Sequence, residues 1–167
     1  MNAGEARKAN KRGAARLAAV QALYQIELTQ AEPRQVIEEF LAHRLSETGK
    51  DEDFGEADEE FFEAIADGAA AHEAELDRVI SAALTPDWPL ARLESVLRAI
   101  LRCGAFELAH RPDVPAEIVI NEYLDITHAF FGAKEPGLVN GVLDSLARQL
   151  RAGELGEKRR DGETASR

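Results

Sequence analysis

The chain has 167 residues, a formal net charge of −11, 45% hydrophobic residues and only 6% aromatic residues. This length suits one domain or two small ones, and an Ala- and Leu-rich composition favours helices over strands. No apolar run approaches the roughly 20 residues needed to cross a bilayer, and no signal-peptide pattern follows the N-terminal charges. The only cysteine, Cys103, has no internal disulfide partner. We therefore expect a cytoplasmic protein without a membrane partner.

Positive charge is concentrated in residues 1–16, which carry a net charge of +4, whereas residues 17–147 carry −17. The five basic residues of this segment are Arg7, Lys8, Lys11, Arg12 and Arg16. An acidic body repels nucleic acid, so any such binding must be confined to a local basic patch. The pattern leaves two interpretations open, a nucleic-acid-binding arm or a merely solvated terminus. Gly13 weakens a helix here by up to about 1 kcal/mol relative to alanine, so we expect the arm to order on contact with a partner.

The first half of the chain shows three helical patterns. Apolar residues at helical spacing follow residue 17, a second pattern covers 33–47, and a third begins at the N-cap candidate Asp58 and runs to about residue 84. The acidic segment 48–58 between the last two is predicted to be a solvated loop. The two prolines of "TPDWP", residues 85–89, end the third pattern and suggest a subdomain boundary.

The second half reads as helices at about 90–109, 115–131 and 135–151, followed by a charged tail at 153–167 that we expect to be disordered. Asn140-Gly141 is typical of a hairpin, but Val139 and Leu143 keep helical spacing through it. We therefore expect Gly141 to allow the close approach of another backbone. The predicted fold is all-α, with helical subdomains at 17–84 and 85–152.

No complete catalytic or metal-binding motif is present in the sequence. "HEAEL", residues 72–76, begins like a zinc-protease helix, but Leu76 replaces the second histidine. Cys103 and His110 would place a thiol near a base, yet Cys103 lies in an apolar part of its helix and is better interpreted as a core residue. Glu122 is a candidate general base for which the spacing supplies no partner. We expect no enzyme activity, no cofactor and no metal.

Three motifs, in this order, resemble the NusB family of bacterial transcription antitermination factors. They are A-R-x-x-A-V-Q-A-L-Y at 15–24, I-L-R-x-G-x-x-E-L with D-V-P-x-x-x-x-I-N-E at 100–122, and F-G with V-N-G-V-L-D at 131–144. The resemblance implies two packed helical subdomains without catalytic activity. It also implies binding to the boxA element of leader RNA together with NusE, a small-subunit ribosomal protein, so that RNA polymerase reads through terminators in ribosomal RNA operons.

The resemblance assigns residues to two RNA-binding segments. The Arg-rich N-terminal segment corresponds to Lys11, Arg12 and Arg16, with Arg7 and Lys8 as extensions. The second segment covers 131–140, where we expect contacts from Lys134, Leu138 and Asn140.

Many relatives have an aromatic residue at the position of Leu138, so we expect a stacking contact to be lost or moved and boxA binding to be weaker than in typical relatives. Asn140 offers a donor and an acceptor, and a role in anchoring helix ends remains equally open. The same two roles are open for Tyr24, Asn121 and Glu122, for which the structural one is favoured, and Gly141 is interpreted as structural.

Two other functions remain open at this point. NusB-like domains also precede the catalytic domain of some ribosomal RNA methyltransferases, but the sequence ends before such a domain, which favours a free-standing factor. A purely protein-binding module is the second alternative, and some members of the family form homodimers. The net charge of −17 over residues 17–147 suits a basic protein partner such as NusE.

Overall fold

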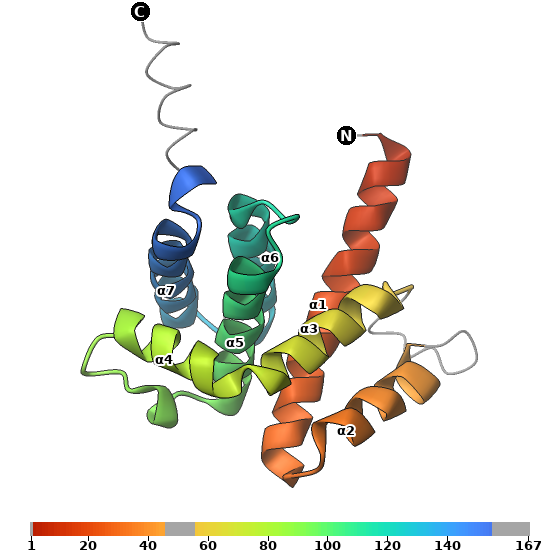
Figure 1. Cartoon of the computed structure of the whole chain (residues 1–167), viewed down its shortest axis with the longest axis horizontal. Helices are drawn as coiled ribbons and strands as arrows, with labels where there is room; N and C mark the ends of the chain where they lie inside the picture. The colour runs from red at the N-terminus through yellow and green to blue at the C-terminus, as the bar shows by residue number, and fades with distance from the viewer. Residues whose placement is uncertain (1, 46–55, 155–167) are drawn as a thin grey trace, which may run out of the picture.

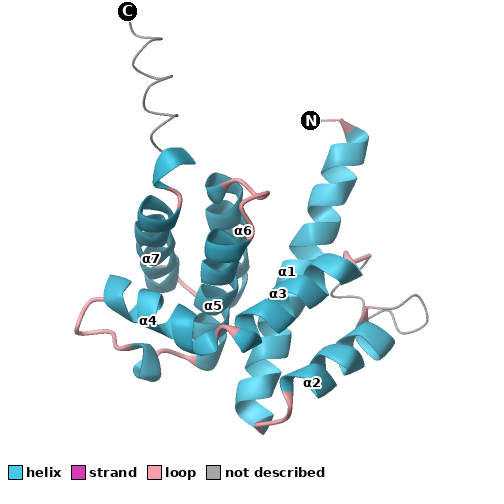
Figure 2. Ribbon diagram, in the orientation of Figure 1, coloured by secondary structure: helices cyan, strands magenta, loops and turns pink. Residues whose placement is uncertain are grey.

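The computed structural model describes residues 2–45 and 56–154, and all regular secondary structure in these ranges is helical (Figure 2). This confirms the all-α prediction. The helices are α1 (Ala3–Thr29), α2 (Pro33–Glu39), the π-helical turn η1 (Phe40–Arg44), α3 (Glu59–Ala71), α4 (Glu73–Ala83), the 3₁₀ turn η2 (Leu90–Arg92), α5 (Ser95–His110), α6 (Ala116–Phe130) and α7 (Lys134–Leu150).

The basic arm is the first part of α1, a single helix that starts at Ala3. A capping box begins it: the Asn2 side chain accepts a hydrogen bond from the Glu5 backbone N–H at 2.8 Å, and the Glu5 carboxylate accepts one from the Asn2 backbone at 3.1 Å. Gly13 does not interrupt the helix. The expectation that the arm orders only on contact with a partner is therefore wrong. Figure 1 shows its free end projecting from the molecule.

The predicted helix at 58–84 is two helices, α3 and α4, which meet at His72. Asp58 is the N-cap of α3, because its carboxylate accepts a hydrogen bond from the Phe61 backbone at 3.0 Å. His72 leaves the helical conformation with φ −104° and ψ 19°, while its ring nitrogen Nδ1 lies 2.9 Å from the Gly68 carbonyl oxygen. The backbone and side chain of His72 thus share one acceptor where the chain turns.

One continuous core joins the helices. The N-terminal helix α1 packs against α3 and α5, α4 packs against α5 and α7, and α6 packs against α5 and α7. Small side chains on α1 allow its neighbours to approach closely, and those with no exposure are Ala15, Ala18, Ala19 and Ala22. In Figure 1, α5 and α6 lie between α7 and α1. The division into subdomains at residue 85 stays a prediction.

The described part of the structure shows no close helix contact at Gly141, where one was predicted, but has one at Gly68. Gly141 is exposed, and a Cβ atom added there would have no neighbour within 4 Å. At Gly68, in contrast, an added Cβ would lie 2.0 Å from Cζ of Phe106. Only glycine lets the Phe106 ring of α5 rest on the backbone of α3.

Several predictions fall partly outside the described residues. The pattern at 33–47 corresponds to α2 and η1 as far as residue 44, and the chain is described to residue 45. Most of the predicted acidic loop at 48–58 and the tail from 155 onward lie outside the described ranges. Residues 152–154, at the start of the predicted tail, form a helical turn.

Candidate nucleic-acid interface

The exposure of the basic side chains of α1 decreases from the free end of the helix toward the bundle. Arg7 and Lys8 are exposed near its free end. The Lys11 side chain is 43% exposed and that of Arg12 is 25% exposed, whereas Arg16 is only 2% exposed. The helix therefore presents Arg7, Lys8 and Lys11 to solvent, whereas Arg12 is only partly exposed and its Nε is buried.

The Phe61 ring packs against two guanidinium groups, that of Arg12 on α1 and that of Arg111 just after α5. The guanidinium carbon of Arg12 lies 4.5 Å from the centroid of Phe61, and that of Arg111 lies 5.1 Å from the same centroid. Arg111 follows α5, 99 positions along the chain from Arg12, so helical spacing carried no signal for it. Its guanidinium donates two hydrogen bonds of 3.0 Å to Asp113, which lower the pKa of that carboxyl group.

Two acidic residues lie beside these cations. Lys11 Nζ is 3.8 Å from Glu56 Oε2, and Arg12 Nε is 3.9 Å from Asp58 Oδ2. The Asp58 backbone N–H also donates to the Lys11 carbonyl oxygen at 3.0 Å, which fixes the chain before α3 against α1. Long, partly exposed ion pairs of this kind contribute little stability.

Arg16 belongs to the core, which corrects its assignment to the RNA surface. Its Nε donates to Glu107 Oε2 at 2.9 Å and its second guanidinium nitrogen to Oε1 at 3.0 Å, while the Tyr123 hydroxyl donates to the same carboxylate. Burial opposes the charge of Arg16, but the hydrogen bond and charge of Glu107 outweigh it, so its pKa is raised. Burial and the charge of Glu107 raise the pKa of Tyr123 well above its usual value.

The three residues considered as catalytic candidates, Glu122, Cys103 and His110, lie among ion-pair and core contacts. Glu122 Oε2 lies 3.8 Å from the Arg16 guanidinium, and burial raises the pKa of Glu122 despite that positive charge. Cys103 is fully buried, and burial together with Glu107 raises its pKa well above the usual value, which disfavours the reactive thiolate. His110 contacts Glu75 at 3.3 Å.

The second predicted RNA segment is not brought to the arm. Lys134 and Asn140 are exposed on α7, on the far side of α5 and α6 from α1 (Figure 1). Leu138 is partly buried and lines a hollow together with Trp88 and Lys134. The exposure of Asn140 argues against a role in anchoring helix ends inside the core.

Two residues interpreted as structural are on the surface. Tyr24 is 37% exposed and lines an apolar groove with Leu28 and Phe130. Asn121 is exposed on α6, beside Asp144 of α7. Their interpretation as structural residues stays a prediction.

These features define an all-helical protein in which a cationic helix end projects from an acidic bundle. Residues 13–148 match the model of the NusB family. The chain belongs to the NusB family.

Named relatives agree over most of the chain. It is 50% identical to the transcription antitermination protein NusB of a Bradyrhizobium species (strain BTAi1) over 152 residues, which are 91% of this chain and 90% of that protein. It is 47% identical to the protein of the same name from Sinorhizobium fredii over 154 residues, 92% of this chain and 94% of that one.

Solved structures show the same fold. The structure of T. maritima NusB is 28% identical with a TM-score of 0.72, over 87% of this chain and 96% of that one. A crystal structure of the antitermination factors NusB and NusE in complex with double-stranded RNA matches with 26% identity and a TM-score of 0.69, over 83% of this chain and 97% of that one. No helix among the described residues is long and apolar enough to span a membrane.

Proposed function

We propose that this protein is a transcription antitermination factor that binds boxA leader RNA together with a NusE-type ribosomal protein. In this role it joins the RNA polymerase antitermination complex in the cytoplasm and promotes read-through of ribosomal RNA operons, without enzymatic activity. Membership of the NusB family supports the proposal, as does the similarity to a NusB structure that contains NusE and RNA.

The observation that carries the proposal is the cationic surface, which we define as Arg7, Lys8, Lys11, Arg12 and Arg111. It lies at the projecting end of α1 on a body of net charge −17 between residues 17 and 147. The anionic body repels phosphates elsewhere, so RNA is directed to this end of the molecule. The terminal nitrogens of Arg12, and the donors of Arg111 that Asp113 does not engage, lie beside Phe61 and offer hydrogen bonds for phosphates and for unpaired bases.

The test is the salt dependence of binding to a fluorescent boxA RNA and to a scrambled RNA, measured by anisotropy. Each lost phosphate contact flattens the log–log slope by about 0.7, so Arg7→Ala with Lys8→Ala should flatten it by about 1.4. The matched control is Arg92→Ala with Arg148→Ala, which removes two exposed cations elsewhere and should leave most of the slope intact. Equal slopes for the two double variants would contradict the assignment.

The acidic neighbour of Lys11 gives a test with the opposite sign. Glu56→Gln removes a carboxylate that competes with phosphate for Lys11, so we expect tighter RNA binding by about 1.5- to 5-fold, as for an exposed pair of 0.2–1 kcal/mol. Lys11→Ala should weaken binding. An affinity unchanged by Glu56→Gln would place Lys11 outside the RNA contact.

The second RNA segment calls for a different readout. Asn140 is exposed and carries no charge, so Asn140→Ala should reduce the preference for boxA over scrambled RNA and leave the salt slope unchanged. Lys134→Ala should flatten the slope by about 0.7. Repeating these titrations with NusE present tests whether the partner increases the preference for boxA, and light scattering of the protein alone tests for a homodimer.

A further inference from the structure

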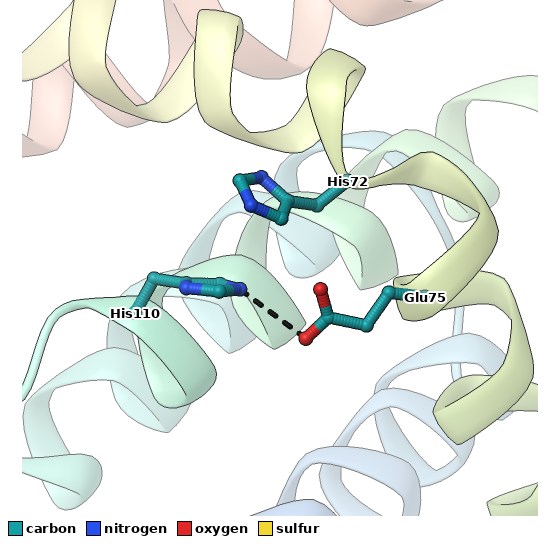
Figure 3. Close-up of side chains that lie close together, drawn as sticks. All are labelled: His72, Glu75 and His110. Atoms are coloured by element: carbon teal, nitrogen blue, oxygen red, sulfur yellow. Dashed lines mark ion pairs between the residues drawn. The ribbon is translucent and has the colours of Figure 1, made fainter.

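Two histidines and a glutamate meet beside the junction of α3 and α4 (Figure 3). They are His72 at the junction, Glu75 in the first turn of α4 and His110 at the end of α5. One ligand atom from each residue lies within 4.8 Å of the other two. His110 Nε2 is 3.3 Å from Glu75 Oε1, and the two imidazole rings are 4.3 Å apart between centroids.

His72 is already oriented as a metal ligand. Its Nδ1 lies 2.9 Å from the Gly68 carbonyl oxygen, which can only accept a hydrogen bond, so Nδ1 carries the proton. The lone pair is then on Nε2. Metal-binding histidines generally donate their second ring nitrogen to a carbonyl or carboxylate in this manner, which fixes the tautomer and the ring orientation. Phe106 supports both rings, at 5.9 Å from His72 and 5.1 Å from His110.

We propose that His72, Glu75 and His110 form a binding site for a divalent transition-metal ion, with Zn²⁺ as the ion of choice. In the sequence motif "HEAEL" the second histidine is replaced by Leu76, which faces the core with no exposure, and the fold brings His110 from α5 to the other two residues instead. Two imidazole nitrogens and one carboxylate form a donor set that suits zinc better than magnesium or calcium. Water completes the coordination, because all three side chains reach solvent.

The distances fit this ion. Zinc bonds of about 2.0–2.1 Å arranged as a tetrahedron set neighbouring ligand atoms about 3.3 Å apart. The contact between His110 and Glu75 already has this length, at 3.3 Å. The remaining separations, up to 4.8 Å, close by rotation of partly exposed side chains without movement of the helices. A bound ion would link the start of α4 to the end of α5, and this proposal does not rest on RNA binding.

The experiment is calorimetric titration of the untagged full chain with zinc chloride, and with magnesium chloride as the comparison. We expect one equivalent of Zn²⁺ to bind and no saturable binding of Mg²⁺. His110→Gln and His72→Gln should each weaken zinc binding at least tenfold, and Glu75→Gln should weaken it measurably. The matched controls are His43→Gln and His128→Gln, which alter exposed histidines outside the cluster and should bind zinc as the wild type does.

Circular dichroism of each variant verifies folding. If His72→Gln fails to fold, the zinc affinity of His110→Gln tests the proposal by itself. A second readout is the visible spectrum of the Co²⁺ form, in which nitrogen and carboxylate ligation in a low-coordinate site gives bands that His110→Gln should abolish. Zinc affinity that is equal in the wild type, His110→Gln and His43→Gln would overturn the proposal. The cluster would then be an ion pair beside two packed rings.

Discussion

Replacing Arg16 with methionine tests the buried network between α1, α5 and α6. The substitution keeps the apolar stem but leaves the Glu107 carboxylate, which is 0% exposed, without its guanidinium partner. Breaking a buried ion pair by removing one partner costs about 3–5 kcal/mol of the free energy of unfolding. For a chain of this size each kcal/mol lowers Tm by about 2–4 °C, so we expect a fall of about 6–20 °C.

Urea unfolding followed by far-ultraviolet circular dichroism measures this loss. Arg148→Met is the matched control, because Arg148 is 66% exposed and pairs with Asp144 one helical turn away. This control should change the free energy of unfolding by no more than about 0.5 kcal/mol. Arg16→Met combined with Glu107→Met removes both charges and should recover part of the stability, since uncompensated burial of the carboxylate is then relieved.

Two results would refute the reasoning. A loss below about 1 kcal/mol for Arg16→Met would mean that Glu107 finds compensation elsewhere. The second result concerns RNA: at a temperature where Arg16→Met is folded, the salt slope of RNA binding should match that of the wild type. A slope flattened by about 0.7 would return Arg16 to the RNA surface.

Further predictions concern Glu27 and two glycines. The hydrogen bond from Arg98 lowers the pKa of Glu27, so its stabilising effect is present above the unfolded pKa of about 4.3 and is lost as the pH falls through the lower folded value. Urea unfolding should show Glu27→Gln less stable by about 1.5–3 kcal/mol at pH 7, with the gap to the wild type narrowing below about pH 4; a constant gap would contradict this. In thermal unfolding, Gly68→Ala should destabilise by about 1–3 kcal/mol because its Cβ meets the packed Phe106 ring, whereas Gly141→Ala should be neutral or stabilising by up to about 1 kcal/mol. Equal effects would refute the packing argument.

Helical periodicity predicted the elements of this fold well, because most of its helices bury one apolar stripe. It failed at His72, where the backbone leaves the helical conformation while the apolar pattern continues. Periodicity also favoured a close contact at Gly141 that the exposed surface of α7 does not provide. A periodic pattern identifies a helical face, but it does not identify the element that covers that face.

The site residues show the same limit. Arg12 and Arg16 lie four positions apart on one face of α1 and look equivalent in the sequence, yet only Arg16 has a buried carboxylate opposite it. The contacts of Arg111 and His110 carried no local signal, because their partners Phe61 and Glu75 lie on α3 and α4. Such pairings depend on how the helices pack against one another, and the spacing of residues in a single sequence does not reveal them.

The continuous course of α1 from the bundle to its capped start has a thermodynamic consequence for association. A disordered tail would pay a free-energy cost of about 1–2 kcal/mol, from lost backbone entropy, for every residue that becomes fixed on the ligand. A segment that is helical beforehand avoids most of this loss, so more of the favourable interaction energy appears as affinity. The rod-like extension also holds its charges at fixed intervals, so under the proposed function we expect the spacing of the side chains, as well as their number, to select among polyanions.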